Sequence, residues 1–142
     1  MTKINKLIIQ IVIANYYEEI TNPLLNSIKK VLTKHKINYS VTFVSGAFEI
    51  PQIINHKIKK NKTNLFIAVG CIIKGQTYHF EVLSNSIAKS LLDISINNKN
   101  TFIVNGILNV NNKSQAVKRT SGKKNKGIEI AKAMLSIIKC IK

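Results

Sequence analysis

The fourteen residues from Val69 to Val82 hold the most chemically versatile group of side chains in the sequence. The stretch runs from the end of an apolar, strand-like segment through a polar turn into a helical pattern that begins near His79. In an open α/β sheet, ligands usually bind where a strand ends and a helix begins. An imidazole titrates near neutral pH, so His79 is the main candidate for proton transfer. The alternative is a helix-capping or surface histidine.

Four other features suit recognition of an anionic, planar or hydroxylated ligand. The turn Gly75-Gln76-Thr77 precedes a helix, where backbone N–H groups can hold an anion. Arg119 is the single arginine of the chain. Its planar guanidinium suits phosphate or carboxylate better than lysine does, although a surface ion pair would also explain it. Tyr16 could stack on a planar ligand or pack in the core. Glu49 could bind ligand hydroxyls or only oppose a helix dipole.

Apolar periodicity indicates the elements that position these residues. Four apolar, β-branched segments are predicted strands, the fourth interrupted at Asn105-Gly106: residues 7–14, 38–44, 65–73 and 102–108. Five helices are expected to alternate with them, the first capped by Thr21 or Asn22 with Pro23 near its first turn. The others are expected at residues 47–58, from 79 to about 97, at 113–119 and from about 125 to 141. This alternation predicts one domain over residues 1–142, a three-layer α/β/α sandwich with a four-stranded parallel sheet of the flavodoxin-like type.

Helical spacing also predicts which side chains face the core. The expected inward residues are Leu24, Ile28, Val31 and Leu32; Ile50, Ile54 and Ile58; Leu83, Ile87, Leu91 and Ile94; and Ile128, Ala131, Leu135 and Ile138. Pro51 falls early enough in its helix to be tolerated in the first turn.

The formal net charge of +16, from 22 Lys and Arg against 6 Asp and Glu, is the one extreme feature of the composition. It suggests nucleic-acid binding, but the lysines are scattered, with short clusters only at 57–60 and 123–126. A nucleic-acid surface needs clustering on one face, and aromatic residues for base stacking are few. A solvated surface and a lysine-rich compositional bias are the preferred explanation, so no nucleic-acid partner is expected.

The cysteines and the first apolar run bear on the expected compartment. Cys71 and Cys140 lie far apart and match no metal-binding spacing, so reduced thiols in a cytoplasmic protein are expected. The apolar run at residues 7–14 is too short to span a bilayer. It follows two lysines, as in a signal peptide, but no small-residue cleavage site follows it, so a buried strand is favoured.

Three motifs in order resemble the lumazine synthase family over nearly the whole chain. The first is Ser45-Gly46-Ala47-Phe48-Glu49-Ile50-Pro51, similar to Pro-Gly-Ala-Phe-Glu-Ile-Pro. The second is Gly70 to Glu81, similar to Gly-x-Val-Ile-Arg-Gly-x-Thr-x-His-Phe/Tyr-Asp/Glu. The third is Gln115-Ala116-Val117-Lys118-Arg119 followed by Asn125-Lys126-Gly127, similar to Gln-Ala-Ile-Glu-Arg and Asn-Lys-Gly.

The resemblance implies condensation of 5-amino-6-(D-ribitylamino)uracil with 3,4-dihydroxy-2-butanone 4-phosphate to 6,7-dimethyl-8-ribityllumazine, phosphate and water, without metal or organic cofactor. It implies a site between subunits of a homopentamer, allows a 60-subunit icosahedral shell, and suggests riboflavin synthase as a partner. His79 would transfer protons. The implied substrate-binding residues are Tyr16 for stacking; Ala47, Phe48 and Glu49 for the ribityl chain and ring; Cys71, Ile72, Ile73 and Asn105 near the ring; Gln76, Thr77 and a neighbour's Arg119 for phosphate; and Lys126 nearby.

The chain also departs from the family pattern. Tyr17 replaces the usual Asn, Lys74 replaces Arg, and Asn105 replaces an aromatic or apolar residue. Lys118 replaces the Glu that commonly precedes the arginine, and the turn at residues 120–124 is one residue shorter. Asn105 and Lys118 leave a catalytically weakened paralogue that keeps the assembly as the second hypothesis. The high net charge alone leaves a basic nucleic-acid-binding domain as the third.

Overall fold

The computed structural model describes residues 7–76 and 79–142. Within them, parallel strands and helices alternate along the chain, and the sheet order is β2-β1-β3-β4. The elements are β1 (Ile8–Ala14), α1 (Glu18–Lys34), β2 (Asn38–Val44), α2 (Glu49–Lys57), β3 (Asn64–Ile73), α3 (His79–Asn97), β4 (Thr101–Val110), α4 (Lys113–Lys118), the 3-10 turn η2 (Gly122–Lys124) and α5 (Lys126–Ile141). The predicted α/β class with a four-stranded parallel sheet is confirmed.

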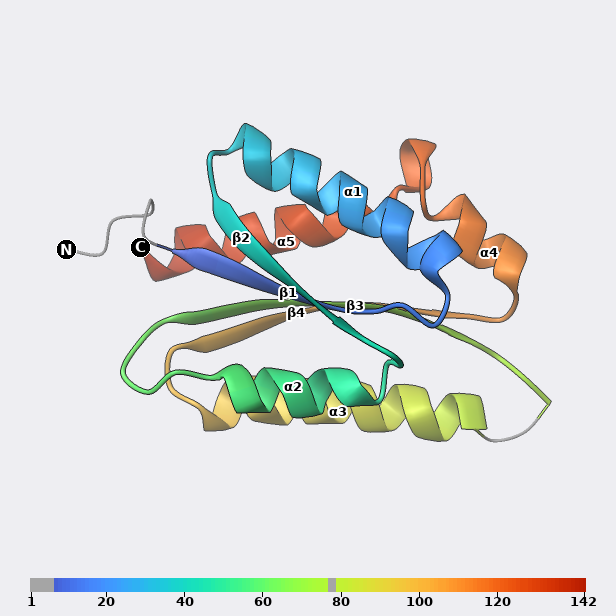
Figure 1. The fold of residues 1–142 in the computed structure, drawn as a ribbon, viewed down its shortest axis with the longest axis horizontal. Helices are drawn as coiled ribbons and strands as arrows, with labels where there is room; N and C mark the ends of the chain where they lie inside the picture. Colours follow the sequence, from blue (N-terminus) through green and yellow to red (C-terminus); the bar gives the residue numbers. More distant parts are fainter. Residues whose placement is uncertain (1–6, 77–78) are drawn as a thin grey trace.

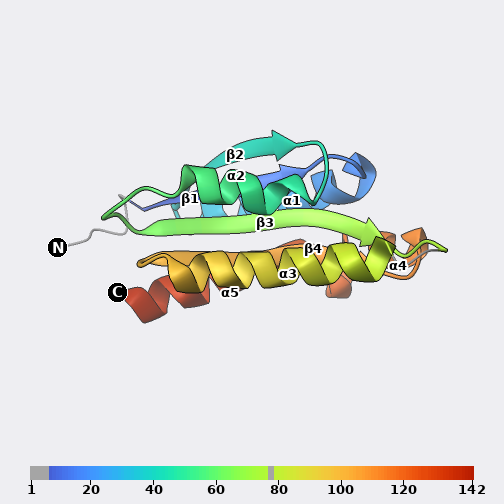
Figure 2. The same cartoon turned by 90° about the horizontal axis from the view of Figure 1, so that it is seen from below.

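Helices cover the sheet on both faces. Helices α1, α4 and α5 lie on one face, and α2 and α3 lie on the other (Figures 1 and 2). None of the helices in the described segments is long and apolar enough to cross a membrane.

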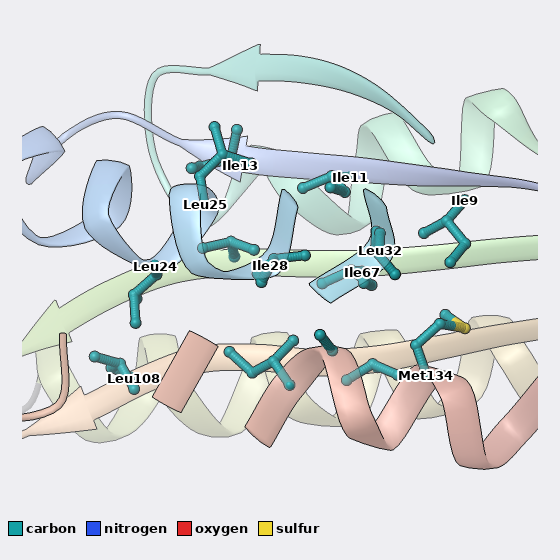
Figure 3. Packing of buried hydrophobic residues seen from close by; sticks show 14 of the residues in the cluster. Ile9, Ile11, Ile13, Leu24, Leu25, Ile28, Leu32, Ile67, Leu108 and Met134 are labelled. Atoms are coloured by element: carbon teal, nitrogen blue, oxygen red, sulfur yellow. The ribbon is translucent and has the colours of Figure 1, made fainter. Parts of the chain in front are cut away.

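The core is divided by the sheet into two apolar clusters. On the α1/α5 side, Ile11, Leu24, Ile67 and Met134 are fully buried and interlock between helices and strands (Figure 3). On the α2/α3 side the cluster includes Phe66, Ile50, Ile54, Ile87 and Leu91. Because β3 is apolar on both faces, it is buried over nearly its full length. The strand ends that carry the candidate site therefore rest on a packed sheet.

Two predicted features of the first helix and fourth strand are wrong. Helix α1 begins at Glu18, ahead of Thr21 and Asn22, because Glu18 and Glu19 offset the positive end of the helix dipole, and Pro23 lies inside the helix. Strand β4 is continuous through Asn105-Gly106, which pair with Ala68 and Val69 of β3. Gly106 is needed in this strand because a side chain there would be too close to Ala68 and Ile130.

The predicted inward face of the last helix is also partly wrong. Ile128 is 38% exposed. The buried stripe consists of Gly127, Ile130, Ala131, Met134 and Ile138, so the prediction is confirmed for Ala131 and Ile138. Ile128 points outward because it lies next to Gly127, the residue through which the first turn of α5 contacts α1.

Candidate active site

A cleft of about 630 Å³ opens at the carboxyl ends of β1 and β3. From β1 the chain crosses by α1 to β2, and from β2 it crosses by α2 to β3 on the other face of the sheet. Loops at such a reversal diverge to opposite faces and leave a crevice where ligands bind. The volume falls within the range of roughly 300–1,000 Å³ that is usual for small-molecule sites.

The cleft gathers predicted residues from three separate parts of the chain: the loop after β1, the loop after β2 with the start of α2, and the end of β3 with the start of α3. Eight of them line it: Tyr16, Ala47, Phe48, Glu49, Cys71, Ile72, Ile73 and His79. Tyr17, Val82 and Leu83 also line it and were missed as site residues. Helical spacing could have identified Val82 and Leu83, because residues three and four positions after His79 share its side of a helix.

Glu49 supplies a carboxylate to one wall of the cleft. The Ser45 hydroxyl donates to Glu49 Oε1 at 3.2 Å, and the Glu49 backbone N–H donates to the Gly46 carbonyl at 3.2 Å. A Cβ on Gly46 would lie 3.3 Å from Glu49 Oε2, so glycine leaves room for the carboxylate to lie against the loop. The group is thereby held at the start of α2, where it can accept hydrogen bonds from ligand hydroxyls.

Two contacts of Lys74 connect the end of β3 to β4 and to α3. The Lys74 backbone N–H donates to the Val110 carbonyl at 2.9 Å, and Lys74 Nζ lies 3.8 Å from Glu81 Oε1. His79 is the first residue of α3 and lines the cleft. Gln76 is exposed and is not among the cleft-lining residues, and Thr77 lies outside the described residues.

Two weakly acidic side chains, Cys71 and Tyr17, are among those that line the cleft. Burial, followed by the nearby Glu19 carboxylate, raises the pKa of the Cys71 thiol to about 11. Burial also raises the pKa of the Tyr17 phenol, reinforced by Tyr16 and Cys71. Both side chains therefore stay protonated at neutral pH, and Cys71 is a packing residue there rather than a thiolate nucleophile.

The two cysteines should differ sharply in alkylation. Cys140 is exposed and Cys71 is buried. Burial limits access to Cys71, and the rise of its pKa to about 11 leaves little of this thiol as the reactive thiolate at pH 8, so iodoacetamide should modify Cys140 much faster. Mass spectrometry of the native protein checks this, with Cys140→Ser isolating Cys71. Equal rates for the two thiols in the native protein would contradict the buried position of Cys71.

Alkaline pH should also weaken the fold through Cys71. The folded state holds the thiol proton of Cys71 more tightly than the unfolded state does. The contribution of this thiol to the free energy of unfolding is therefore complete below pH 9.0 and is lost as the pH rises toward about 11.

Arg119 lies at the end of α4, a short helix fixed by side-chain caps. Asn112 Oδ1 accepts from the Gln115 N–H at 2.9 Å, and Gln115 Oε1 accepts from the Asn111 N–H at 2.7 Å. Arg119 Nη1 in turn donates to the Gln115 carbonyl at 2.8 Å. Gln115 therefore orders both ends of the helix, and the guanidinium is directed along it.

Lys126 is joined directly to Arg119 through the backbone. The Lys126 N–H donates to the Arg119 carbonyl at 2.8 Å, and Lys126 Nζ lies 2.9 Å from Glu129 Oε1. Asn125 caps α5 and donates to the Ser27 hydroxyl at 3.0 Å. A Cβ on Gly127 would lie 2.7 Å from the Leu24 carbonyl, so only glycine allows α5 to approach α1 this closely. The Asn-Lys-Gly motif thus holds the backbones of Arg119 and Lys126 together where α4 meets α5, and this pair of residues is called the cationic corner below.

This cationic corner and Asn105 are separate from the cleft of the same chain. Arg119, Lys126 and Asn105 are not among the cleft-lining residues. Asn105 is exposed on β4, where its Oδ1 accepts from the Ile107 N–H at 3.1 Å. The structure of one chain therefore brings together the predicted stacking, ribityl-binding and proton-transfer residues, but not the predicted phosphate-binding arginine.

A doubly wound parallel sheet with an aromatic, carboxylate and imidazole cleft at its switch point defines an α/β enzyme of small polar substrates. Among the described residues, no group of three or more His, Cys, Asp or Glu could hold a metal ion. The family model for 6,7-dimethyl-8-ribityllumazine synthase matches residues 6–142, and the chain belongs to this family.

Curated relatives carry the same family name. A 6,7-dimethyl-8-ribityllumazine synthase of Bartonella bacilliformis is 40% identical, covering 90% of this chain and 86% of the relative. One of Bartonella henselae is 40% identical, over 94% and 87%. The 6,7-dimethyl-8-ribityllumazine synthase 1 of Rhizobium meliloti is 34% identical, over 97% and 94%.

Proposed function

We propose that this chain is a transferase of riboflavin biosynthesis that condenses 5-amino-6-(D-ribitylamino)uracil with 3,4-dihydroxy-2-butanone 4-phosphate. The products are 6,7-dimethyl-8-ribityllumazine, phosphate and two molecules of water. One water leaves when the amine and ketone form an imine, and the other leaves when the ring closes. The supporting observation is that eight predicted site residues, Tyr16 and seven from the family-like motifs, converge on one cleft.

The cleft chemistry suits this reaction. Tyr16 offers an aromatic face for the pyrimidine, and Glu49 offers an acceptor for ribityl hydroxyls. Ile72, Ile73 and Val82 provide apolar walls that exclude water around the reacting atoms. In this proposal His79 moves protons during imine formation and phosphate elimination. Such a condensation depends on positioning and proton transfer more than on a strong nucleophile.

The proposal includes a site shared between subunits of a homopentamer. In a head-to-tail ring, each chain would present Arg119, Lys126 and Asn105 to the cleft of its neighbour, where Gln76 and Thr77 would help to bind phosphate. Their separation from the cleft of their own chain supports this arrangement. Light scattering should give five times the 15.9 kDa of one chain, or twelve such pentamers if a 60-subunit shell forms. A monomer would leave the proposed site incomplete.

The direct test is to mix the purified protein with both substrates and follow lumazine fluorescence. A rate clearly above the spontaneous condensation supports the proposal, and the spontaneous rate alone rejects it. A weakened paralogue is the second candidate, because Asn105 is tied to its own strand and offers no aromatic wall. Slow but protein-dependent turnover that increases in Asn105→Phe would favour that candidate. Location in the cytoplasm and association with riboflavin synthase belong to the same proposal.

Replacing His79 with Ala should lower kcat by about tenfold, less than a typical loss of general acid–base catalysis, because substrate positioning remains. Steady-state rates with both substrates saturating measure this. His56→Ala is the matched control, since His56 is an exposed histidine in the last turn of α2, away from the cleft. Unchanged turnover in His79→Ala would remove this side chain from the mechanism.

A further inference from the structure

We infer that Tyr17 is a positioning residue that holds the ring of Tyr16 as a stacking platform at the cleft. The two rings are perpendicular, with centroids 4.8 Å apart and an interplanar angle of 89°. Both side chains line the cleft. The inference rests on the proposed function, because it concerns the binding of that reaction's planar pyrimidine.

The ring of Tyr16 is largely open to solvent. It lies in the loop between β1 and α1, and it is 74% exposed. An aromatic side chain in water samples several rotamers, and a ligand that stacks on it must select one of them. A neighbour that restricts these rotamers in advance would reduce the entropic cost of binding.

Tyr17 is suited to be that neighbour because both its backbone and its side chain are held by the rest of the protein. Its carbonyl accepts the backbone N–H groups of Ile20 and Thr21 at 2.9 and 3.0 Å, as well as the Thr21 hydroxyl at 3.3 Å. Its side chain is half-buried and packs against the apolar cluster that contains Cys71. Tyr17 therefore connects the exposed ring of Tyr16 to the rigid core.

The perpendicular geometry leaves stacking surface available. Two rings at a right angle contact each other edge to face, so at least one face of Tyr16 is not covered by Tyr17. The interaction uses the aromatic ring of Tyr17 and does not need its hydroxyl. Loss of one such pair corresponds to a change in binding of about 2- to 10-fold.

The test compares Tyr17→Leu with Tyr17→Phe in steady-state kinetics. Tyr17→Leu should raise the KM for the ribitylaminouracil about 3- to 10-fold, with kcat and the KM for the butanone phosphate close to wild type. Tyr17→Phe should restore wild-type values, because it keeps the ring. Tyr17→Met fills the same apolar space without a ring and replaces the Leu variant if that variant does not fold.

A double-mutant cycle with Tyr16→Ala isolates the interaction. In the Tyr16→Ala background, Tyr17→Leu should have no further effect on the KM for the ribitylaminouracil. The inference is overturned if Tyr17→Leu binds this substrate as wild type does, if Tyr17→Phe is as impaired as Tyr17→Leu, or if both KM values rise together. Wild-type protein that forms no lumazine would reject the proposed function itself, whereas these outcomes in an active enzyme reject only the role of Tyr17.

Discussion

Replacing Arg119 with Ala should raise the KM for the phosphate-bearing substrate by about 10- to 100-fold. Hydrogen bonds to charged groups contribute roughly 1.5–3 kcal/mol each, and about 1.4 kcal/mol is a factor of ten in affinity. The guanidinium is already directed by its bond to the Gln115 carbonyl, so little order must be gained on binding. The KM for the ribitylaminouracil should change much less. Initial rates with each substrate varied in turn measure both constants.

Two variants serve as controls for Arg119→Ala. Arg119→Lys keeps the charge but loses the planar pair of donors, so its KM should be intermediate. Lys118→Ala removes an adjacent exposed cation and should leave the KM unchanged if the effect is specific to Arg119. A normal KM for the phosphate substrate in Arg119→Ala would argue against phosphate binding by this residue.

Replacing Gly106 with Ala should destabilise the protein by about 1–3 kcal/mol, the usual cost of overpacking a core. The new Cβ would lie 2.7 Å from the Ala68 carbonyl oxygen and 2.7 Å from Ile130 Cδ1. The isoleucine can rotate, but the carbonyl belongs to β3, which is paired on both sides in the centre of the sheet. Relief of this close contact therefore requires a shift of the backbone of β3 or β4, because movement of a side chain alone is not enough.

Gly75→Ala is the matched control for the Gly106 variant. Among the residues that the structure describes, a Cβ on Gly75 would meet no atom within 4 Å, so the substitution should be neutral or stabilise by up to about 1 kcal/mol through the unfolded chain. Urea unfolding at equal protein concentration compares the variants, because assembly makes stability concentration-dependent. Similar midpoints for the two variants would show that β4 can move away from β3 and α5.

The sequence was sufficient to predict the order of strands and helices because burial on both faces leaves nearly continuous apolar runs. The run that became β3 is the clearest example, since helices cover the sheet on both faces and this strand is buried over nearly its full length. Local composition gave wrong predictions where residues elsewhere in the sequence decide the local structure. Asn105-Gly106 has the composition of a turn, but the need for glycine comes from Ala68 and Ile130. Similarly, Thr21 has the chemistry of a cap, yet the dipole interaction of Glu18 and Glu19 sets the helix start.

The candidate site likewise has features that could be predicted from the sequence and features that depend on tertiary structure. Residues in the loops after β1, β2 and β3 could be grouped from sequence, because parallel strands bring their carboxyl ends to one edge. The contribution of Tyr17 could not be predicted, because it depends on how one ring meets another. The absence of Arg119 and Lys126 from the cleft lining also depends on tertiary structure, since a backbone hydrogen bond holds these two residues together where α4 meets α5.

The separation of this cationic corner from the cleft has a genetic consequence for the proposed ring. Each subunit would act as acceptor for one neighbour through its cleft and as donor to the other through Arg119 and Lys126. A subunit defective only in its cleft would still donate Arg119 to the adjacent site. A subunit that lacks only Arg119 would still have an intact cleft and would receive the arginine of its other neighbour. Two inactive alleles of these opposite kinds would therefore complement each other in mixed rings, whereas one allele with both defects would inactivate two sites per subunit.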